Sequence, residues 1–242
     1  MTTVLPRTEV GATTFDVAET RLREGFEAMV GDLGLSDIVI PTSYRNPNNI
    51  PADRYGLVPI TRNPDPQYPA RKSALPAGFD CRMPQDVSCV YYNGVQVHNM
   101  PHLDTNFGIG LTYQPEESEA RRHLVAVTAA GVVQEYWEPD NVYLQVKQLQ
   151  GLVSNAMQPE LAPALRPGWF KVRESLLNAW LEIAPKLGIG TVAVWSVHNN
   201  PYAVNAGDAP TRKRFERGYD DVARGMGFVL DDKTKLWLKQ VD

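Results

Sequence analysis

Cysteine, long apolar runs and a strong charge of either sign are all scarce in this chain. Its 242 residues include two cysteines, Cys81 and Cys89, which are too few for a disulfide framework or a zinc site. No stretch is apolar enough to span a membrane, and the N-terminus has no charged segment followed by an apolar one. The formal net charge of −4 gives no general attraction to nucleic acid or to anionic membranes. We therefore expect a cytoplasmic protein with reduced thiols, no metal site, no membrane partner and no general binding of nucleic acid.

Regular patterns are also scarce between residues 41 and 84, where nine of the nineteen prolines fall. Proline fixes φ and lacks a backbone donor, so this stretch is expected to be mostly irregular. It still carries many tyrosine and aliphatic side chains, which favours an ordered loop that lies over the rest of the fold.

The remainder of the N-terminal half shows short, clear signals. Over residues 15–31, apolar side chains recur at helical spacing, and Thr14 or Asp16 is the candidate N-cap. A later signal contains Asn93-Gly94, which suits the positive φ angles of a two-residue turn. In order, these signals predict a helix over residues 15–31, a strand over 36–40, a hairpin over 90–97 and a strand over 107–113.

The second half of the chain has the strongest pattern, an ordered run of strands and helices. The pattern predicts strands over residues 123–128, 132–137 and 141–147, a helix over 170–187, a strand over 191–197, a helix over 212–224, and strands over 227–230 and 235–239. A turn at residues 129–131 separates the first two strands. Residues 123–242 are therefore expected to form an α+β core, a mixed sheet flanked by helices. Residues 1–122 are expected to pack on this core as part of one continuous domain.

The last part of the chain contains two short motifs that accompany these strands and helices. Asn200-Pro-Tyr-Ala203 follows a predicted strand, and the next predicted helix ends in Gly227-Phe228 before a closing hairpin. Over residues 123–242 this arrangement resembles the GNAT superfamily of acetyl-coenzyme A dependent N-acyltransferases. The resemblance implies transfer of an acetyl group from coenzyme A to an amine by direct attack. The amine would belong to a small molecule or a protein, and a homodimer is compatible with the pattern.

The resemblance also implies where the coenzyme would bind. In such a fold two parallel strands splay apart, and free backbone groups of one strand hold the pantetheine arm. The pyrophosphate lies against the start of the following long helix. The family's glycine-rich phosphate turn is only half matched, by Gln148 and Gly151, and fails at Val153. The residues implied as coenzyme contacts are Leu144, Val146, Gln148, Gly151, Lys171, Arg173 and Asn200, with Lys171 and Arg173 replacing the turn by charge pairing.

Catalysis would need a proton donor for the leaving thiolate and a base for the amine. Many family enzymes carry a tyrosine five residues before the phenylalanine of the Gly-Phe pair. In this chain that phenylalanine is Phe228, and the position is occupied by Ala223. Tyr219, one turn earlier on the same helix face, is the predicted donor. The candidate bases are His198 and Glu135. Residues 204–214 are expected to form a loop that overhangs the site.

Two other functions remain open on the sequence. The incomplete phosphate turn and Ala223 also fit a GNAT-like binding or assembly module without catalysis. His102-x-Asp104 with the distant His198 matches the two-histidine, one-carboxylate set of Fe(II)/2-oxoglutarate oxygenases. Pro101 and the alternation of strands with helices disfavour that reading. They favour His98, His102 and Asp104 as polar groups on a loop after the hairpin, where they would line the acceptor side of a cleft.

Overall fold

The computed structural model describes residues 13–33, 55–61, 90–92, 95–97, 104–113, 122–135, 138–151 and 169–242. The expected strand at residues 36–40 lies outside this part of the chain, as does most of the proline-rich loop. The helices are α1 (Thr14–Gly31), α3 (Trp169–Leu187), α4 (Pro201–Val204) and α5 (Ala209–Gly225). The strands are β1 (Tyr55–Thr61), β2 (Val90–Tyr92), β3 (Val95–Val97), β4 (Phe107–Tyr113), β5 (Arg122–Gln134), β6 (Val142–Gly151), β7 (Thr191–Trp195), β8 (Val229–Leu230) and β9 (Leu236–Gln240).

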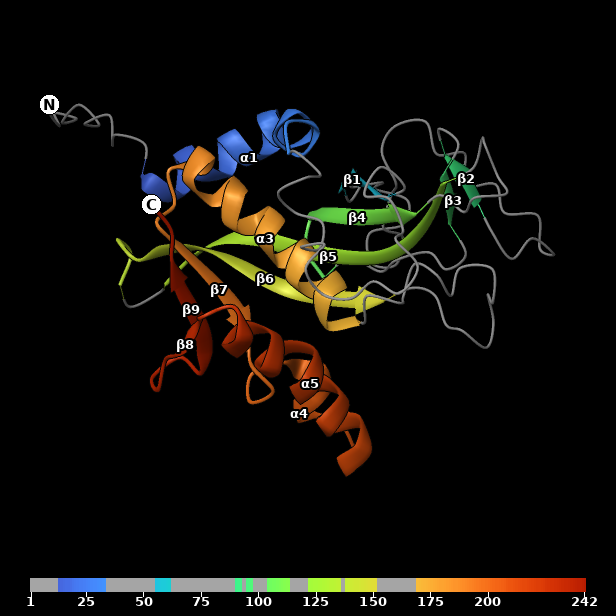
Figure 1. The fold of residues 1–242 in the computed structure, drawn as a ribbon. Coiled ribbons are helices and arrows are strands. Elements are labelled where there is room, and N and C mark those ends of the chain that lie inside the picture. The colour runs from blue at the N-terminus through green and yellow to red at the C-terminus, as the bar shows by residue number, and fades with distance from the viewer. Residues whose placement is uncertain are drawn as a thin grey trace, which may run out of the picture.

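One mixed sheet runs through the molecule in the order β1-β4-β5-β6-β7-β9-β8 (Figure 1). Neighbours in this order are antiparallel except β6 and β7, which are parallel and joined by α3. The short β2–β3 hairpin, predicted around Asn93-Gly94, pairs with β5 through β3. The fold is therefore α+β, a mixed sheet flanked by helices, as the sequence predicted.

The predicted turn at residues 129–131 is wrong, because β5 is one continuous strand of 13 residues. Ala129 and Ala130 are completely buried, and each pairs with β4 on one side and β6 on the other. Two strand partners and burial outweigh the weak local preference of Ala-Ala-Gly for a turn. The hairpin partner of β5 is consequently β4, so the sheet continues across the expected boundary between residues 122 and 123.

Two details of the N-terminal half also differ from expectation. The cap of α1 is Thr13, whose side chain accepts from the backbone N–H of Asp16, while the Asp16 carboxylate accepts from the N–H of Thr13. Asp16 is thus the second half of a capping box. Within the proline-rich stretch, β1 forms the edge of the sheet and contains Pro59. An edge strand tolerates proline because one side of it needs no donor.

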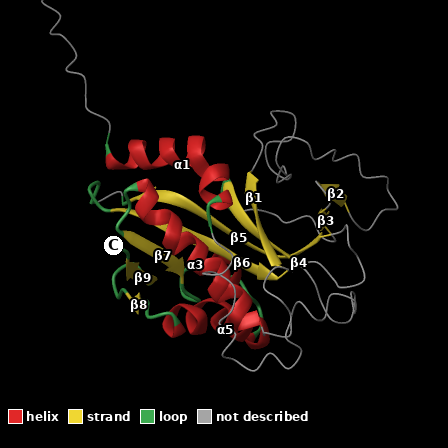
Figure 2. Cartoon of the chain, turned by 45° about the horizontal axis from the view of Figure 1, so that its top comes forward, coloured by secondary structure: helices red, strands yellow, loops and turns green. Residues whose placement is uncertain are grey.

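Helices α1 and α3 lie across the sheet together (Figure 2). Trp180 of α3 is fully buried and stacks on Phe26 of α1 with ring centroids 5.8 Å apart. Its Nε1 donates to Thr128 Oγ1 of β5 at 3.1 Å, and this hydroxyl donates to the Gln148 carbonyl of β6 at 2.7 Å. One side chain therefore connects both helices to the two longest strands of the sheet.

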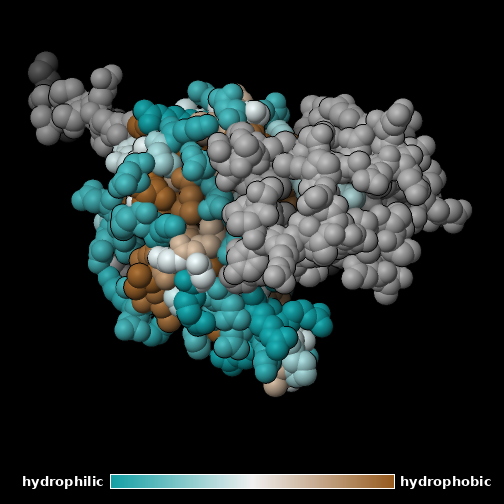
Figure 3. Space-filling view, in the orientation of Figure 1, coloured by the Kyte–Doolittle hydropathy of each residue, from teal (hydrophilic) through white to brown (hydrophobic). Residues whose placement is uncertain are grey.

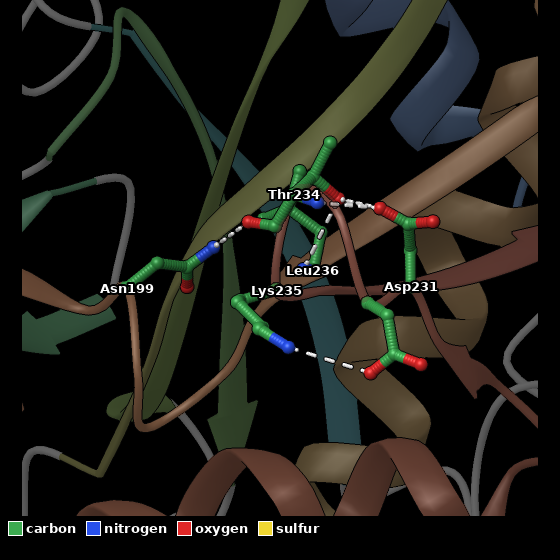
Figure 4. A network of polar contacts seen from close by, with 6 residues as sticks. Asn199, Asp231, Thr234, Lys235 and Leu236 are labelled. Carbon is green, nitrogen blue, oxygen red and sulfur yellow. Dashed lines mark hydrogen bonds and ion pairs between the residues drawn. The ribbon is translucent and has the colours of Figure 1, made fainter.

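The turn between β8 and β9 is held by polar contacts (Figure 4). The Asp231 carboxylate accepts from both the N–H and the hydroxyl of Thr234, each at 2.6 Å. Asn199, which follows β7, donates to the Thr234 carbonyl at 3.3 Å. This bond fixes the chain just after β7, where the candidate site begins.

The surface over α5 is largely hydrophilic (Figure 3). Arg212, Lys213, Arg214 and Arg217 of this helix are all exposed. Among the described helices, none has both the length and the apolar character that crossing a bilayer requires.

Candidate functional site

The candidate site lies where the parallel strands β6 and β7 separate. Their last pair in register is Val146 with Val194. Strand β7 ends at the next residue, Trp195, whereas β6 continues to Gly151. On this side, residues 147–151 of β6 have no partner strand in the described part of the chain. Backbone groups of β6 that point to this side must find other partners.

A bulge in β6 marks the start of this free edge. Val146 and Gln148 pair with consecutive residues of β5, so Lys147 between them is an extra residue. A bulge shifts the alternation of side chains. Val146 and Leu149 consequently both face the hydrophobic core, although they are three residues apart.

Tyr219 of α5 occupies the gap beside this edge. Its hydroxyl accepts a hydrogen bond from the Leu149 N–H at 3.1 Å and lies 3.4 Å from the Lys147 carbonyl, to which it donates. The side chain is 7% exposed. Burial raises the pKa of Tyr219 to about 12, while the Leu149 hydrogen bond acts in the opposite direction. The phenol therefore stays protonated at neutral pH.

The next residue fixes the position of α5. The buried Asp220 carboxylate accepts from the Val197 N–H at 3.0 Å and from Trp237 Nε1 at 2.9 Å. These donors belong to the turn after β7 and to β9. A buried carboxylate with two hydrogen-bond donors is strongly oriented. Asp220 therefore fixes this turn of α5, and with it the position of the neighbouring Tyr219 beside β6.

The free edge of β6 and the helices beside it enclose a cleft of about 490 Å³. Segments far apart in the sequence contribute to it. The lining residues are Asp104, Gln148, Leu149, Gln150, Gly151, Arg173, Tyr202, Arg214, Phe215, Gly218 and Tyr219.

Aromatic rings line one side of the cleft. Tyr202 of α4 stacks on Phe215 of α5, with centroids 6.4 Å apart and an angle of 8° between the ring planes. Phe215 in turn lies 6.1 Å from the Tyr219 ring. Tyr202 is 51% exposed, so the row reaches from solvent to the buried phenol.

Arg173 of α3 brings a positive charge beside Tyr219. A methyl group placed on Gly218 would lie 3.4 Å from Arg173 Cζ, so the guanidinium packs directly on α5. Burial lowers the pKa of Arg173, and Tyr219 acts against this shift. The guanidinium is a delocalised cation that proteins do not deprotonate. A second arginine in the cleft, Arg214, is exposed.

Asn200 supplies a buried amide next to the phenol. Its Oδ1 caps α4 by accepting from the N–H groups of Tyr202 and Ala203 at 2.9 and 3.2 Å. Its Nδ2 is buried and has no hydrogen bond of regular geometry in the described structure. The amide nevertheless lies close enough to the Tyr219 hydroxyl to lower its pKa slightly. An unsatisfied buried donor is costly, and a ligand acceptor would satisfy it.

Asp104, just before β4, supplies the acidic group of the cleft. Its backbone N–H donates to Gln148 Oε1 at 3.3 Å. Its Oδ1 accepts from the Tyr202 hydroxyl at 2.8 Å, a contact that raises the pKa of Tyr202.

The structure brings some predicted site residues together and separates others. Gln148, Gly151, Arg173 and Tyr219 line one cleft, and Asn200 lies beside it. Leu144 and Val146 pair in register with β7, so the free edge begins after them. Residues 148–151 extend β6 and do not form a turn. Lys171 lies in the first turn of α3, where the described structure extends to its backbone only.

The two candidate bases differ in position. His198 is exposed in the turn after β7, close in sequence to Asn200. Glu135 follows β5 at the far end of the β5–β6 pair. Seven residues of β6 lie between that end and Leu149, which corresponds to about 20 Å along the strand. Glu135 is therefore not part of the cleft.

The described structure offers little support for the oxygenase hypothesis. Within the described residues, no three His, Cys, Asp or Glu side chains gather as a metal site would require. His98 and His102 lie outside that part of the chain. The parallel β6–β7 pair with its α3 crossover also differs from a double-stranded β-helix.

Sequence reasoning missed Tyr202, Arg214 and Phe215 as cleft residues, whereas it expected Asp104 on the acceptor side of a cleft. The expected overhanging loop at residues 204–214 is partly helical, because α5 begins at Ala209 after the Asp208 cap. The signal for it was present, since Asp208-Ala-Pro210 is a typical helix start.

Comparison with known proteins gives little further information. No family model matches the chain, and no curated protein matches it. Among solved structures, the chain is similar to a mutant of the toxin AtaT, bound to the C-terminus of the antitoxin AtaR and to acetyl-CoA. This match has a TM-score of 0.27 and 10% sequence identity, and it covers 55% of this chain and 67% of that chain. A likeness this weak supports neither the fold nor the function of this chain.

Proposed function

We propose that this protein transfers an acetyl group from acetyl-coenzyme A to an amine. The main support is the edge of β6 beyond Val146, which has no partner strand among the described residues. This edge faces a cleft that contains the cations Arg173 and Arg214 and the protonated phenol of Tyr219. A pantetheine arm carries amide groups that pair with such an edge as an added strand does. The orphaned Asn200 Nδ2 is a further donor for an arm in this position.

We use the positions of Arg173 and Tyr219 to orient the acetyl donor, acetyl-coenzyme A, in the cleft. The two side chains are neighbours, so both meet the same part of a bound donor. We assign this part to the thioester, so Arg173 is not the pyrophosphate contact that the sequence suggested. We assign the phosphates to Arg214 and Lys171. Arg214 lies five residues earlier on α5, about 7 Å closer to the helix N-terminus.

In the reaction, the amine nitrogen attacks the thioester carbonyl carbon, the new C–N bond forms and the C–S bond breaks. Tyr219 gives its proton to the leaving sulfur, and Arg173 stabilises the negative charge that develops there. The Leu149 N–H is a donor for the carbonyl oxygen once Tyr219 releases it. The first proton of the ammonium leaves through water, for which His198 is the candidate base, and the second, lost after the C–N bond forms, restores the Tyr219 phenol.

Thermal denaturation tests this function against the two alternatives. Acetyl-coenzyme A is expected to raise the melting temperature by an amount that grows with the logarithm of its concentration above Kd, because it binds only the folded state. Stabilisation by Fe(II) with 2-oxoglutarate alone would indicate the oxygenase. Stabilisation by neither would contradict the transferase and leave the assembly module.

The Arg214→Ala variant tests the phosphate assignment. It should raise the Kd for acetyl-coenzyme A by about tenfold at low ionic strength, because one exposed charge-assisted contact is lost. S-acetylpantetheine has no pyrophosphate, so its Kd should not change. Arg212→Ala on the same helix is the matched control, since this arginine is exposed and does not line the cleft. Equal effects of the two variants on acetyl-coenzyme A would contradict the assignment.

A further inference from the structure

We propose that the acceptor is a cationic aliphatic amine, and that Asp104 and Tyr202 form its binding site at the cleft. This inference rests on the proposed function and names the substrate class for the same site. It follows from how these two residues are held and from what surrounds them.

Asp104 is held in place by the sheet on both sides. Its N–H is bonded to the Gln148 side chain of β6. The hydroxyl of the next residue, Thr105, donates to the carbonyls of Ala130 on β5 and Phe107 on β4, at 2.8 and 2.9 Å. The carboxylate therefore has a fixed origin and is not carried by a loose surface loop.

Tyr202 orients this carboxylate from the opposite direction. The two residues are 98 positions apart, and the phenol donates to Asp104 Oδ1 at 2.8 Å. The phenol ring is itself fixed, because it stacks on Phe215 and follows the α4 cap at Asn200. A carboxylate held at both its backbone and its side chain is preorganised for a ligand.

The surroundings of the carboxylate favour a protonated amine. An ammonium ion binds well to a carboxylate and to the faces of aromatic rings. Tyr202 offers a half-exposed ring next to Asp104, and Phe215 continues this aromatic row. An acceptor with its own carboxylate next to the amine would be repelled by Asp104.

The site also lies within reach of the chemistry. Asp104 and Tyr219 line the same cleft, and the charge of Asp104 contributes to the raised pKa of the Tyr219 phenol. Arg173 also lies beside Tyr219, where it packs against Gly218. The cleft thus contains cations for the donor, a carboxylate for the acceptor, and the phenol that supplies the proton.

The bonds and protons of the acetyl transfer also balance when the ammonium is bound at Asp104. The ammonium bound at Asp104 loses one proton to water, its nitrogen takes the acetyl group as the C–S bond breaks, the thiolate receives the proton of Tyr219, and the second proton of the acylated nitrogen restores the Tyr219 phenol. The product amide is neutral at that nitrogen. Asp104 then holds it less tightly, which favours product release.

Cadaverine and 1,5-pentanediol are the probes, because they have the same chain length and differ in carrying ammonium or hydroxyl groups at their ends. Calorimetry with the full chain, with and without acetyl-coenzyme A, gives each Kd. Thiol release gives kcat/KM. Wild-type protein should bind cadaverine about tenfold or more tightly than the diol, as expected for one desolvated charge pair. Asp104→Asn should abolish this preference and leave the Kd for acetyl-coenzyme A unchanged.

Two further variants separate recognition from folding. Tyr202→Phe keeps the ring and removes the hydroxyl, so cadaverine binding should weaken less than in Asp104→Asn. Asp140→Asn, an exposed acid at the β5–β6 connection, should change nothing. Equal binding of both probes by wild-type protein, or an unchanged preference in Asp104→Asn, would overturn the assignment. Failure of acetyl-coenzyme A to bind would instead overturn the proposed function, since the cadaverine Kd is measured without it.

Discussion

Replacing Tyr219 by phenylalanine is expected to lower kcat by about 100-fold or more, the usual contribution of a general acid. The Kd for acetyl-coenzyme A should stay the same or decrease. The phenol hydroxyl now accepts from the Leu149 N–H on the free edge of β6. Its removal therefore frees a backbone donor for the ligand while it eliminates the proton source.

Steady-state rates and calorimetry together check this expectation. Tyr143→Phe is the matched control, because Tyr143 is a buried tyrosine that belongs to a separate small apolar cluster with Ala193 and Leu236. Its activity should equal that of wild type. If Tyr219→Phe retained full turnover, the phenol would have only a structural role. A parallel loss of turnover and affinity would show that Tyr219 binds the donor and does not protonate the sulfur.

The variant Trp180→Ala should lower the free energy of unfolding by about 3–5 kcal/mol, the range for removing a large buried aromatic ring. The indole is completely buried, stacks on Phe26 and donates to Thr128. Its loss opens a cavity between α1, α3 and the sheet. The Thr128 hydroxyl also orients the Gln148 carbonyl on β6, so the variant should weaken acetyl-coenzyme A binding as well.

Urea denaturation followed by circular dichroism measures this loss. Trp180→Phe keeps most of the apolar volume and removes only the hydrogen bond, so it should cost about 1–2 kcal/mol. Leu181→Ala, at a partly buried neighbouring position, should lie below the Trp180→Ala value. A Trp180→Ala protein within about 1 kcal/mol of wild type would show that the contact between α1 and α3 is not a main support of the fold.

Local patterns in the sequence determined most of the helices and several strands. The three- and four-residue spacing of apolar side chains predicted α3 at residues 170–187, and the structure has Trp169–Leu187. Asn93-Gly94 predicted the β2–β3 hairpin. Such signals depend on neighbours within a few residues, so the chain itself contains them wherever it folds.

Pairing between distant strands overruled the local signal at β5. Ala129-Ala130-Gly131 has the composition of a turn, and no property of these residues alone predicts a strand. Burial between β4 and β6 makes small side chains an advantage there. The bulge at Lys147 likewise depends on the register between β5 and β6, which is a tertiary property.

The candidate site divides in the same way. The sequence indicated Tyr219 and Asn200 through the family resemblance, with Tyr219 one helical turn before the motif position Ala223 and Asn200 after the end of a strand. Only the tertiary structure placed Asp104 beside Tyr202, because a contact between residues 98 positions apart leaves no local trace. Which side chains share the cleft is decided by the separation of β6 from β7, and that separation depends on where two strands stop pairing.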